Sequence, residues 1–442
     1  MDSRPQQQSR SVSIPAYARL LRDNRNFRRL WSAQIVSEIG DWFYSLSIYS
    51  LLLQLTGKPS SVALALVLQV LPQTFTGPTA GVVNDRIRRK QVMITADLAR
   101  VAIVLCMLFV RTRSMVWLVY PLLLLETIMA AFFEPARSSV IPNIVKRDDL
   151  IVANTLSATT WSLNLAIGAT LGGLVAALLG RNAVFIINAL SFLASALLIS
   201  GMRFVEPHAE RAQPLRAREL VHYSPVLEGL RYIGSDLRLL VTVCAKSGIG
   251  FLGAGWVYFT VMGAQVFPIK GPHMSVQRGA MLSISLLWGA RGVGALIGPL
   301  FSASWAGQRE RRLRTGILIG YLMGAIGYLV LGAAPSLWIA CSLVVFAHCG
   351  TSTVWVFSST LLQLKTDDRF RGRVFSADFG LCMLVIAVAG YVAGILLDAG
   401  VSVRLLASAT GACMILPFVI WAFALRLWRE QPETVAMSQP RG

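Results

Sequence analysis

The chain has 442 residues, of which 55% are hydrophobic and only 14% are charged, and its mean hydropathy is +0.60. Such a composition leaves too little polar surface to cover a water-soluble globule, which excludes the soluble protein classes. The net charge of +19 is typical of a nucleic-acid binder only in a charged, soluble fold, so we predict a polytopic membrane protein without a nucleic-acid partner.

Twelve apolar stretches are each long enough to cross a bilayer, for which roughly 20 residues suffice. We therefore predict an all-α membrane protein with twelve transmembrane helices. The first stretch is unusual because it carries two carboxylates. The stretches lie at about 30–55, 60–84, 91–110, 115–136, 152–179, 182–202, 238–266, 279–305, 313–333, 336–363, 374–397 and 403–427.

The longest loop separates the spans into six and six, which predicts two six-helix bundles. It contains a short amphipathic stretch with Leu227, Leu230 and Ile233, which we interpret as a helix on the membrane surface. The N-terminal residues lack an apolar core, so we expect no cleavable signal peptide. The predicted parts are an N-terminal tail (1–29), a first bundle (30–203), a linker (204–237), a second bundle (238–428) and a C-terminal tail (429–442).

The distribution of basic residues predicts the orientation of the spans. Of the 41 Lys and Arg residues, 31 fall in the tails and in the loops on the same side as the tails, 7 fall in the opposite loops and 3 lie inside spans. The positive-inside rule then places both termini in the cytoplasm.

The two halves share landmarks at one spacing. Gly77-Pro78 recurs as Gly298-Pro299, 221 residues later, and Ser138-Ser139 recurs as Ser358-Ser359, 220 residues later. Parallel repeats of this kind, with a binding site between them near the midplane, occur in one class of secondary transporters.

The loop after the second span reads Gly81-Val-Val-Asn-Asp85-Arg86-Ile-Arg88-Arg89-Lys90. It resembles motif A of the major facilitator superfamily, G-x-x-x-D-R-x-G-R-R/K, except that Arg88 replaces the second glycine. Further runs, such as Phe133-Glu134-Pro135-Ala136-Arg137-Ser138, are similar to the drug- and siderophore-efflux branch, which includes the enterobactin exporter and macrolide-efflux proteins.

The resemblance implies a cytoplasmic gate. Asp85 would brace the start of span eleven at Val374, and Arg89 would pair with Glu134. The alternative is that this basic cluster only sets topology and faces anionic lipid. The predicted gate residues are Gly81, Asp85, Arg86, Arg89, Lys90, Glu134 and Asp378.

Span five contains Gly168, Gly172 and Gly173, which resemble the antiporter motif C although Ala169 stands where its proline would be. These glycines equally suit a close contact between two helices. Both readings stay open.

Several ionisable residues lie inside predicted spans, where each costs roughly 2.5–3.5 kcal/mol if it faces lipid. Glu38 and Asp41 share one face of span one, and two carboxylates so close favour proton uptake by one of them, which suits proton coupling. The alternative is a structural pair neutralised by Lys246 or Arg291. For these two basic residues, binding of an anionic substrate is a second alternative.

Other buried charges have a simpler interpretation. Asp97 and Arg100 are three residues apart, which favours an ion pair within one helix over a gating role. Glu126 lies in mid-span and is either a third candidate for proton coupling or a protonated carboxyl in the core.

Aromatic residues suit a large, partly apolar ligand, although tryptophan also anchors helices at membrane interfaces. The predicted cavity aromatics are Trp42, Trp161, Trp256, Trp288 and Trp355.

The sequence contains no P-loop and no HExxH motif, and its six cysteines form no CxxC pair, so we predict no enzyme, no cofactor and no metal site. The resemblance implies a proton-coupled exporter of hydrophobic or amphiphilic small molecules such as drugs, macrolides or siderophores. It would work as a monomer in the lipid bilayer of a bacterial inner membrane. The alternatives are a lysophospholipid or lipid transporter and a membrane sensor that does not transport.

Overall fold

The computed structural model describes residues 14–206, 224–272, 274–306 and 309–428. The described part contains helices and no strands. The predicted C-terminal tail, half of the predicted linker (residues 207–223) and residues 1–13 of the predicted N-terminal tail lie outside it.

The first half of the chain folds into one short helix and six long ones. The long helices follow the predicted apolar stretches but extend further at several ends; the first of them begins at residue 25 and not at 30. Their bounds are α1 (Ile14–Asp23), α2 (Arg25–Thr56), α3 (Pro59–Arg86), α4 (Arg89–Cys106), α5 (Val119–Ile144), α6 (Leu150–Leu179) and α7 (Arg181–Ser200).

The second half begins with the predicted amphipathic helix and continues with six spans, two of which are interrupted. The bounds are α9 (Ser224–Ser235), α10 (Leu237–Gly248), α11 (Gly253–Val261), α12 (Val276–Ala306), α13 (Glu310–Leu331), α14 (Leu337–Lys365), α15 (Asp368–Asp398), α16 (Val403–Cys413) and α17 (Ile415–Ala424).

Eleven helical segments of the described part are long and apolar enough to cross a membrane. The twelfth span is α2, which has 32 residues and carries Arg25, Arg28, Arg29, Glu38 and Asp41. These charges lower the mean hydropathy of α2 but do not shorten the helix. The predicted all-α membrane fold is confirmed.

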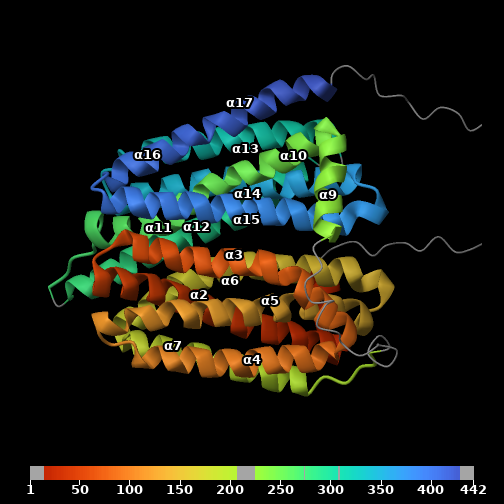
Figure 1. The fold of residues 1–442 in the computed structure, drawn as a ribbon, viewed down its shortest axis with the longest axis horizontal. Coiled ribbons are helices and arrows are strands. Elements are labelled where there is room, and N and C mark those ends of the chain that lie inside the picture. The colour runs from red at the N-terminus through yellow and green to blue at the C-terminus, as the bar shows by residue number, and fades with distance from the viewer. Residues whose placement is uncertain (1–13, 207–223, 273, 307–308, 429–442) are drawn as a thin grey trace, which may run out of the picture.

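The long helices run side by side and fall into two groups (Figure 1). Helices α2 to α7 pack on one another, as do α10 to α17. The groups meet where α6 packs on α12 and α3 packs on α15. Helix α9 lies across the ends of the long helices.

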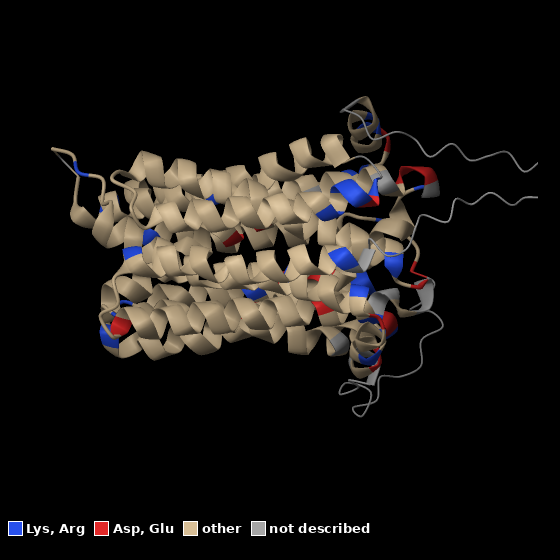
Figure 2. Ribbon diagram, turned by 90° about the horizontal axis from the view of Figure 1, so that it is seen from above, with Lys and Arg blue, Asp and Glu red and all other residues tan. Residues whose placement is uncertain are grey.

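Charged residues gather at the end of the molecule where α9 lies (Figure 2), which we call the charged end. Helix α3 ends there at Arg86 and α4 begins there at Arg89. The other end, where α2 ends at Thr56 and α15 ends at Asp398, is called the opposite end. A few charges lie along the middle of the helices.

Span seven, predicted at about 238–266, runs over Leu237–Val266. It divides into α10, a 3-10 turn (Ile249–Leu252), α11 and a π-helical turn (Met262–Val266). A Cβ on Gly253 would lie 2.8 Å from the Cα of Ile386 in α15, and a Cβ on Gly250 would lie 2.6 Å from the Cβ of Val385. Glycines therefore let the interrupted span approach α15 closely.

The two groups touch most closely toward the opposite end. A Cβ on Gly173 of α6 would collide with Ser285 of α12, and Gly292 of α12 lies against Ala166 of α6. Gly394 of α15 similarly lies against Ala63 near the start of α3. Gly77 and Gly81, in the half of α3 toward the charged end, face open space.

Candidate functional site

The centre of the first helix group holds an arginine between two carboxylates. Arg100 of α4 lies 2.5 Å from Oδ1 of Asp97, which confirms the predicted ion pair within one helix, and 3.8 Å from Oδ2 of Asp41 in α2. The guanidinium stacks over the rings of Phe133 and Phe192, at 4.8 and 4.1 Å from their centroids. Arg100 is thus held rigidly, and its weaker bond is the one to Asp41.

Asp41 is the least satisfied of these carboxylates. Its side chain is 36% exposed, whereas that of Asp97 is fully buried. One oxygen, Oδ1, is buried and has no hydrogen-bond partner among the described residues. Glu126 of α5, which is 8% exposed, completes the cluster and interacts electrostatically with Asp41 and Arg100. Asp41 can therefore gain or lose a proton without breaking a strong contact.

Glu38 lies one turn from Asp41 and belongs to a second network. It accepts hydrogen bonds from Gln34 and from Asn164 of α6, both at 2.8 Å. The amide of Gln34 in turn accepts a bond of 2.9 Å from Arg137. Arg137 also binds Glu134 at 2.7 Å.

This second network leads from Glu38 toward the charged end, because Glu134 and Arg137 lie in the last three turns of α5. The side chain of Glu134 is 52% exposed. Arg137 was quoted in the sequence as part of a run but was not predicted as a site residue. Its position three residues after Glu134 was the available signal.

In this conformation Arg89 is not paired with Glu134. Glu134 pairs with Arg137, while Arg89 donates to the backbone oxygen of Ser139 at 2.9 Å and ties the start of α4 to the end of α5. Asp85 lies 3.7 Å from Arg89, and its side chain is 74% exposed.

The other predicted gate residues lie nearby. Lys90 donates to the backbone oxygen of Met202 at 2.7 Å, and Gly81 and Arg86 lie in the last two turns of α3. Val374 is buried in a small apolar cluster with Ile233 of α9.

Lys246 and Asp378 form a buried ion pair in the second group, with 2.7 Å between Nζ and Oδ2. The lysine also donates to Ser359 at 3.0 Å and lies 4.3 Å from the ring centroid of Trp355. Lys246 therefore does not neutralise Glu38 or Asp41 here. Asp378 lies in α15, between one and two turns after the span begins at Arg373.

Four of the five predicted cavity aromatics come together where the two groups meet. We call them the aromatic seam: Trp42, Trp161, Trp256 and Trp288. Trp42 of α2 contacts Trp161 of α6 and Trp288 of α12, with centroids 6.3 and 6.0 Å apart. Trp288 is fully buried and Trp161 is 47% exposed, so the seam has one open side.

Arg291 lies on α12, three residues after Trp288 of the aromatic seam. Its guanidinium carbon lies 4.5 Å from the ring centroid of Trp256 and 4.9 Å from that of Trp288. Its Nη1 is buried and has no hydrogen-bond partner among the described residues.

The predicted glycine motif of span five lies against α2 and α12. A Cβ on Gly168 would lie 2.9 Å from the Cβ of Trp42, and one on Gly172 would lie 2.8 Å from the Cα of Phe43. Gly173 faces Ser285 of α12. The glycines thus allow a close contact between helices, which is the packing role that the sequence left open.

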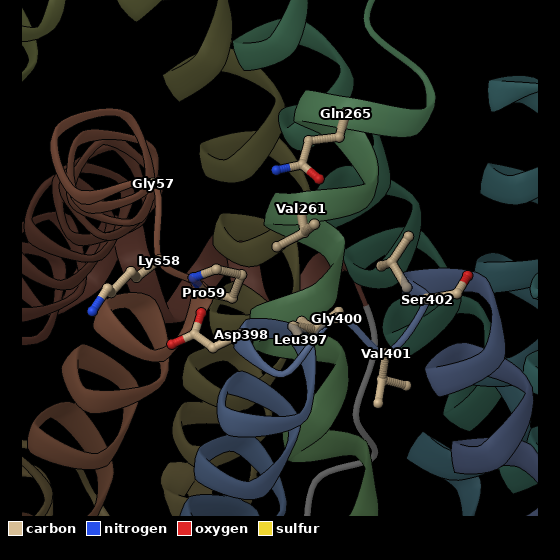
Figure 3. Close-up of a pocket in the computed structure, with 11 residues that line it drawn as sticks. Gly57, Lys58, Pro59, Val261, Gln265, Leu397, Asp398, Gly400, Val401 and Ser402 are labelled. Atoms are coloured by element: carbon tan, nitrogen blue, oxygen red, sulfur yellow. The ribbon is translucent and has the colours of Figure 1, made fainter.

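A pocket of about 490 Å³ opens at the opposite end (Figure 3). It lies between the loop from α2 to α3 and the ends of α11 and α15, and Lys58, Gln265 and Asp398 line it. Asp398 accepts a hydrogen bond of 3.4 Å from the backbone amide of Ser60. This contact links α15 to the first turn of α3 across the two groups.

Comparison with known proteins gives one family. The model of the Major Facilitator Superfamily matches residues 30–390. Macrolide efflux protein A of Streptococcus pyogenes is 25% identical over 366 residues, which are 82% of this chain and 87% of that protein. The putative bacilysin exporter BacE of Bacillus subtilis is 25% identical over 332 residues, or 72% of this chain and 76% of that protein.

A solved structure shares the fold. A bacterial homologue of the human lysosomal transporter Spinster, in an inward-facing and occupied conformation, superposes with a TM-score of 0.67 at 14% identity. The match covers 96% of this chain and 100% of that one.

Proposed function

The chain belongs to the major facilitator superfamily, and on that premise we propose that it is a proton-coupled exporter of hydrophobic or amphiphilic small molecules. It works by alternating access, in which the two helix groups rock about the site between them. The groups are the predicted bundles, 30–203 and 238–428. The charged end faces the cytoplasm, because basic residues concentrate there.

The environment of Asp41 carries this proposal. A coupling carboxylate must bind and release a proton once per cycle, so it needs a counter-charge that is close but not locked. Arg100 at 3.8 Å meets this requirement, whereas the 2.5 Å bond to Asp97 is permanent by comparison. Partial exposure of Asp41 gives water access to the carboxyl group.

The contacts between the groups favour an inward-facing state. Close packing of α6 on α12 and of the start of α3 on α15 lies toward the opposite end, and Gly77 and Gly81 of α3 face open space nearer the charged end. In this state Asp41 would release its proton to the cytoplasm and the site would take up substrate. The exposed Asp85 would reach the start of α15 only after the charged end closes.

The network from Glu38 to Glu134 supports a cytoplasmic proton route, in which Gln34 and Arg137 hold the two carboxylates in position and do not themselves carry the proton. Gln34 and Arg137 connect the two carboxylates by hydrogen bonds of 2.9 Å or less. Glu38, only one turn from Asp41, is the second residue in this pathway. Glu126 would tune Asp41 through their electrostatic contact.

The substrate class is inferred from the aromatic seam and from the relatives. Stacked indole rings favour flat or bulky apolar molecules. The related proteins are named for the efflux of macrolides and the export of bacilysin, which supports export as the direction of transport.

The test uses inside-out membrane vesicles with an imposed proton gradient, acidic inside, and a radiolabelled macrolide. Wild type should accumulate the macrolide only while the gradient lasts. Asp41→Asn should abolish the accumulation and still bind the macrolide. Asp23→Asn, which removes an exposed acid at the end of α1, is the matched control and should behave as wild type.

Two outcomes would contradict the proposal. Accumulation that ignores the gradient in wild type would rule out proton coupling. Gradient-driven accumulation in Asp41→Asn equal to wild type would remove Asp41 from the coupling site. Movement of a fluorescent lysolipid, with no response to any macrolide, would favour the lipid-transport alternative.

A further inference from the structure

Arg291 differs from the other basic residues in the middle of the bundle. Arg100 has Asp97 and Asp41, and Lys246 has Asp378. Among the described residues, no carboxylate lies within ion-pair distance of Arg291. A buried charge is normally paired, since its removal from water is otherwise uncompensated.

The surroundings of Arg291 stabilise a cation but do not neutralise it. The faces of Trp256 and Trp288 lie 4.5 and 4.9 Å away, and the two ring centroids are 5.3 Å apart at an interplanar angle of 78°. Two indole rings therefore form two walls around the guanidinium. Cation–π attraction offsets part of the desolvation cost and leaves the positive charge in place.

Unused hydrogen-bond donors gather at this position. Nη1 of Arg291 and Nε1 of Trp288 are both buried without a partner among the described residues. The other electrostatic neighbours of Arg291 are the hydroxyls of Tyr49 and Tyr328 and the imidazole of His348, and none of them is a carboxylate. The site lacks a negatively charged acceptor.

We propose that Arg291 binds the carboxylate of acidic substrates, so that amphiphilic organic acids are among the transported molecules. This inference rests on the proposed export function and adds a named class to its substrates. The guanidinium fork matches the two oxygens of a carboxylate, and Trp256 and Trp288 cover the adjoining apolar part. Trp42 packs on Trp288 and directly follows Asp41 in α2, which connects the proposed acid site to the coupling carboxylate.

The experiment is a binding titration on the purified full-length protein in nanodiscs of zwitterionic phosphatidylcholine, without a proton gradient. The probes are a dansyl-labelled long-chain carboxylic acid and its methyl ester, which differ only in the charge. Dansyl fluorescence reports binding of each probe. The variants are Arg291→Gln, which removes the charge, and Arg291→Lys, which keeps the charge and loses the fork.

Arg312→Gln is the matched control. Arg312 also lies over a tryptophan, 5.8 Å from the centroid of Trp305, but its Nη1 donates to the backbone oxygen of Trp305 at 2.6 Å. Wild type and this control should prefer the acid over the ester by roughly tenfold or more in Kd. Arg291→Gln should lose the preference, and Arg291→Lys should keep part of it.

Retention of the full preference in a folded Arg291→Gln protein would overturn the proposal, as would equal binding of acid and ester by wild type. If Arg291→Gln does not fold, the same preference in Arg291→Lys and wild type would count against a role for the fork. Displacement of the acid by phosphatidylglycerol added to the nanodiscs would reassign the site to a lipid phosphate and overturn the substrate assignment. Because binding is measured without a gradient, failure of proton-coupled export would leave this result intact.

Discussion

Lys246 of α10 and Asp378 of α15 form an ion pair in which neither side chain is more than 4% exposed, with Nζ and Oδ2 2.7 Å apart. The pair joins the first segment of the interrupted seventh span to the eleventh. Cys382, one turn further along α15, is also buried against α10 and contacts the backbone oxygen of Lys246. This pair is therefore a fixed point inside the second bundle.

Removing one partner of this pair should destabilise the protein strongly. Asp378→Asn leaves the lysine charge buried without a counter-charge, which we expect to cost about 3–5 kcal/mol. The double variant Lys246→Met with Asp378→Leu removes both charges and should be much less destabilised. Thermal unfolding in detergent, followed by circular dichroism, measures both. An equal loss in the single and double variants would contradict a pairing role.

Breaking the network between Glu38 and Glu134 should slow the release of protons. Gln34→Leu removes the amide that links Glu38 to Arg137 while keeping a side chain of similar size. We expect gradient-driven transport to fall by roughly tenfold or more and macrolide binding to stay within about twofold. The control is Gln54→Leu in the last turn of the same helix. Unchanged transport in Gln34→Leu would show that protons leave by another route.

The contact between Asp398 and Ser60 should help to hold the opposite end closed. Asp398→Ala removes the acceptor, and loss of one hydrogen bond of about 0.5–1.5 kcal/mol corresponds to a shift of roughly 2- to 10-fold in the open population. The readout is the labelling rate of a cysteine introduced at Val401 in the pocket of Figure 3. Asp398→Asn keeps an acceptor oxygen and should label nearly as slowly as wild type. Identical labelling rates in all three proteins would show that this hydrogen bond does not hold the opposite end closed.

A larger residue at Gly173 should separate α6 from α12. The Cβ of Gly173→Val would overlap Ser285, so the two bundles must move apart at the opposite end. We expect faster labelling at Val401 and loss of transport. Gly180→Val is an unsuitable control because Gly180 has a φ of 83°, whereas Ala176→Val, on the same helix, tests the added volume alone. Full transport in Gly173→Val would contradict the close contact.

The spans were predictable because length and apolarity alone define them. Even so, α2 could be predicted as a span only by disregarding the charged residues that it carries. The break in span seven depends on how closely α15 approaches Gly250 and Gly253. The pairing of Asp97 with Arg100 was predictable because both lie on one turn of one helix. The pairing of Lys246 with Asp378 was not, because 132 residues separate them and sequence alone does not tell which helix faces meet.

The aromatic seam was predicted only as a set of residues. Its four members are brought together from four different helices, whereas the fifth predicted aromatic, Trp355, packs on Lys246 instead. The isolation of Arg291 was even less accessible to sequence reasoning. Arg291 is isolated because the buried carboxylates Asp41, Asp97 and Asp378 lie next to Arg100 and Lys246.

The two surface helices at the charged end are attached to different bundles. Helix α1 packs on α2 and α6, whereas α9 packs on α10 and α15, with Tyr232 stacked on Phe370 at 4.4 Å. If the bundles rock, each helix must travel with its own bundle. The distance between a spin label on α1 and a spin label on α9 would then change as the bundles rock. It would report each step of the cycle without any label in the transport path.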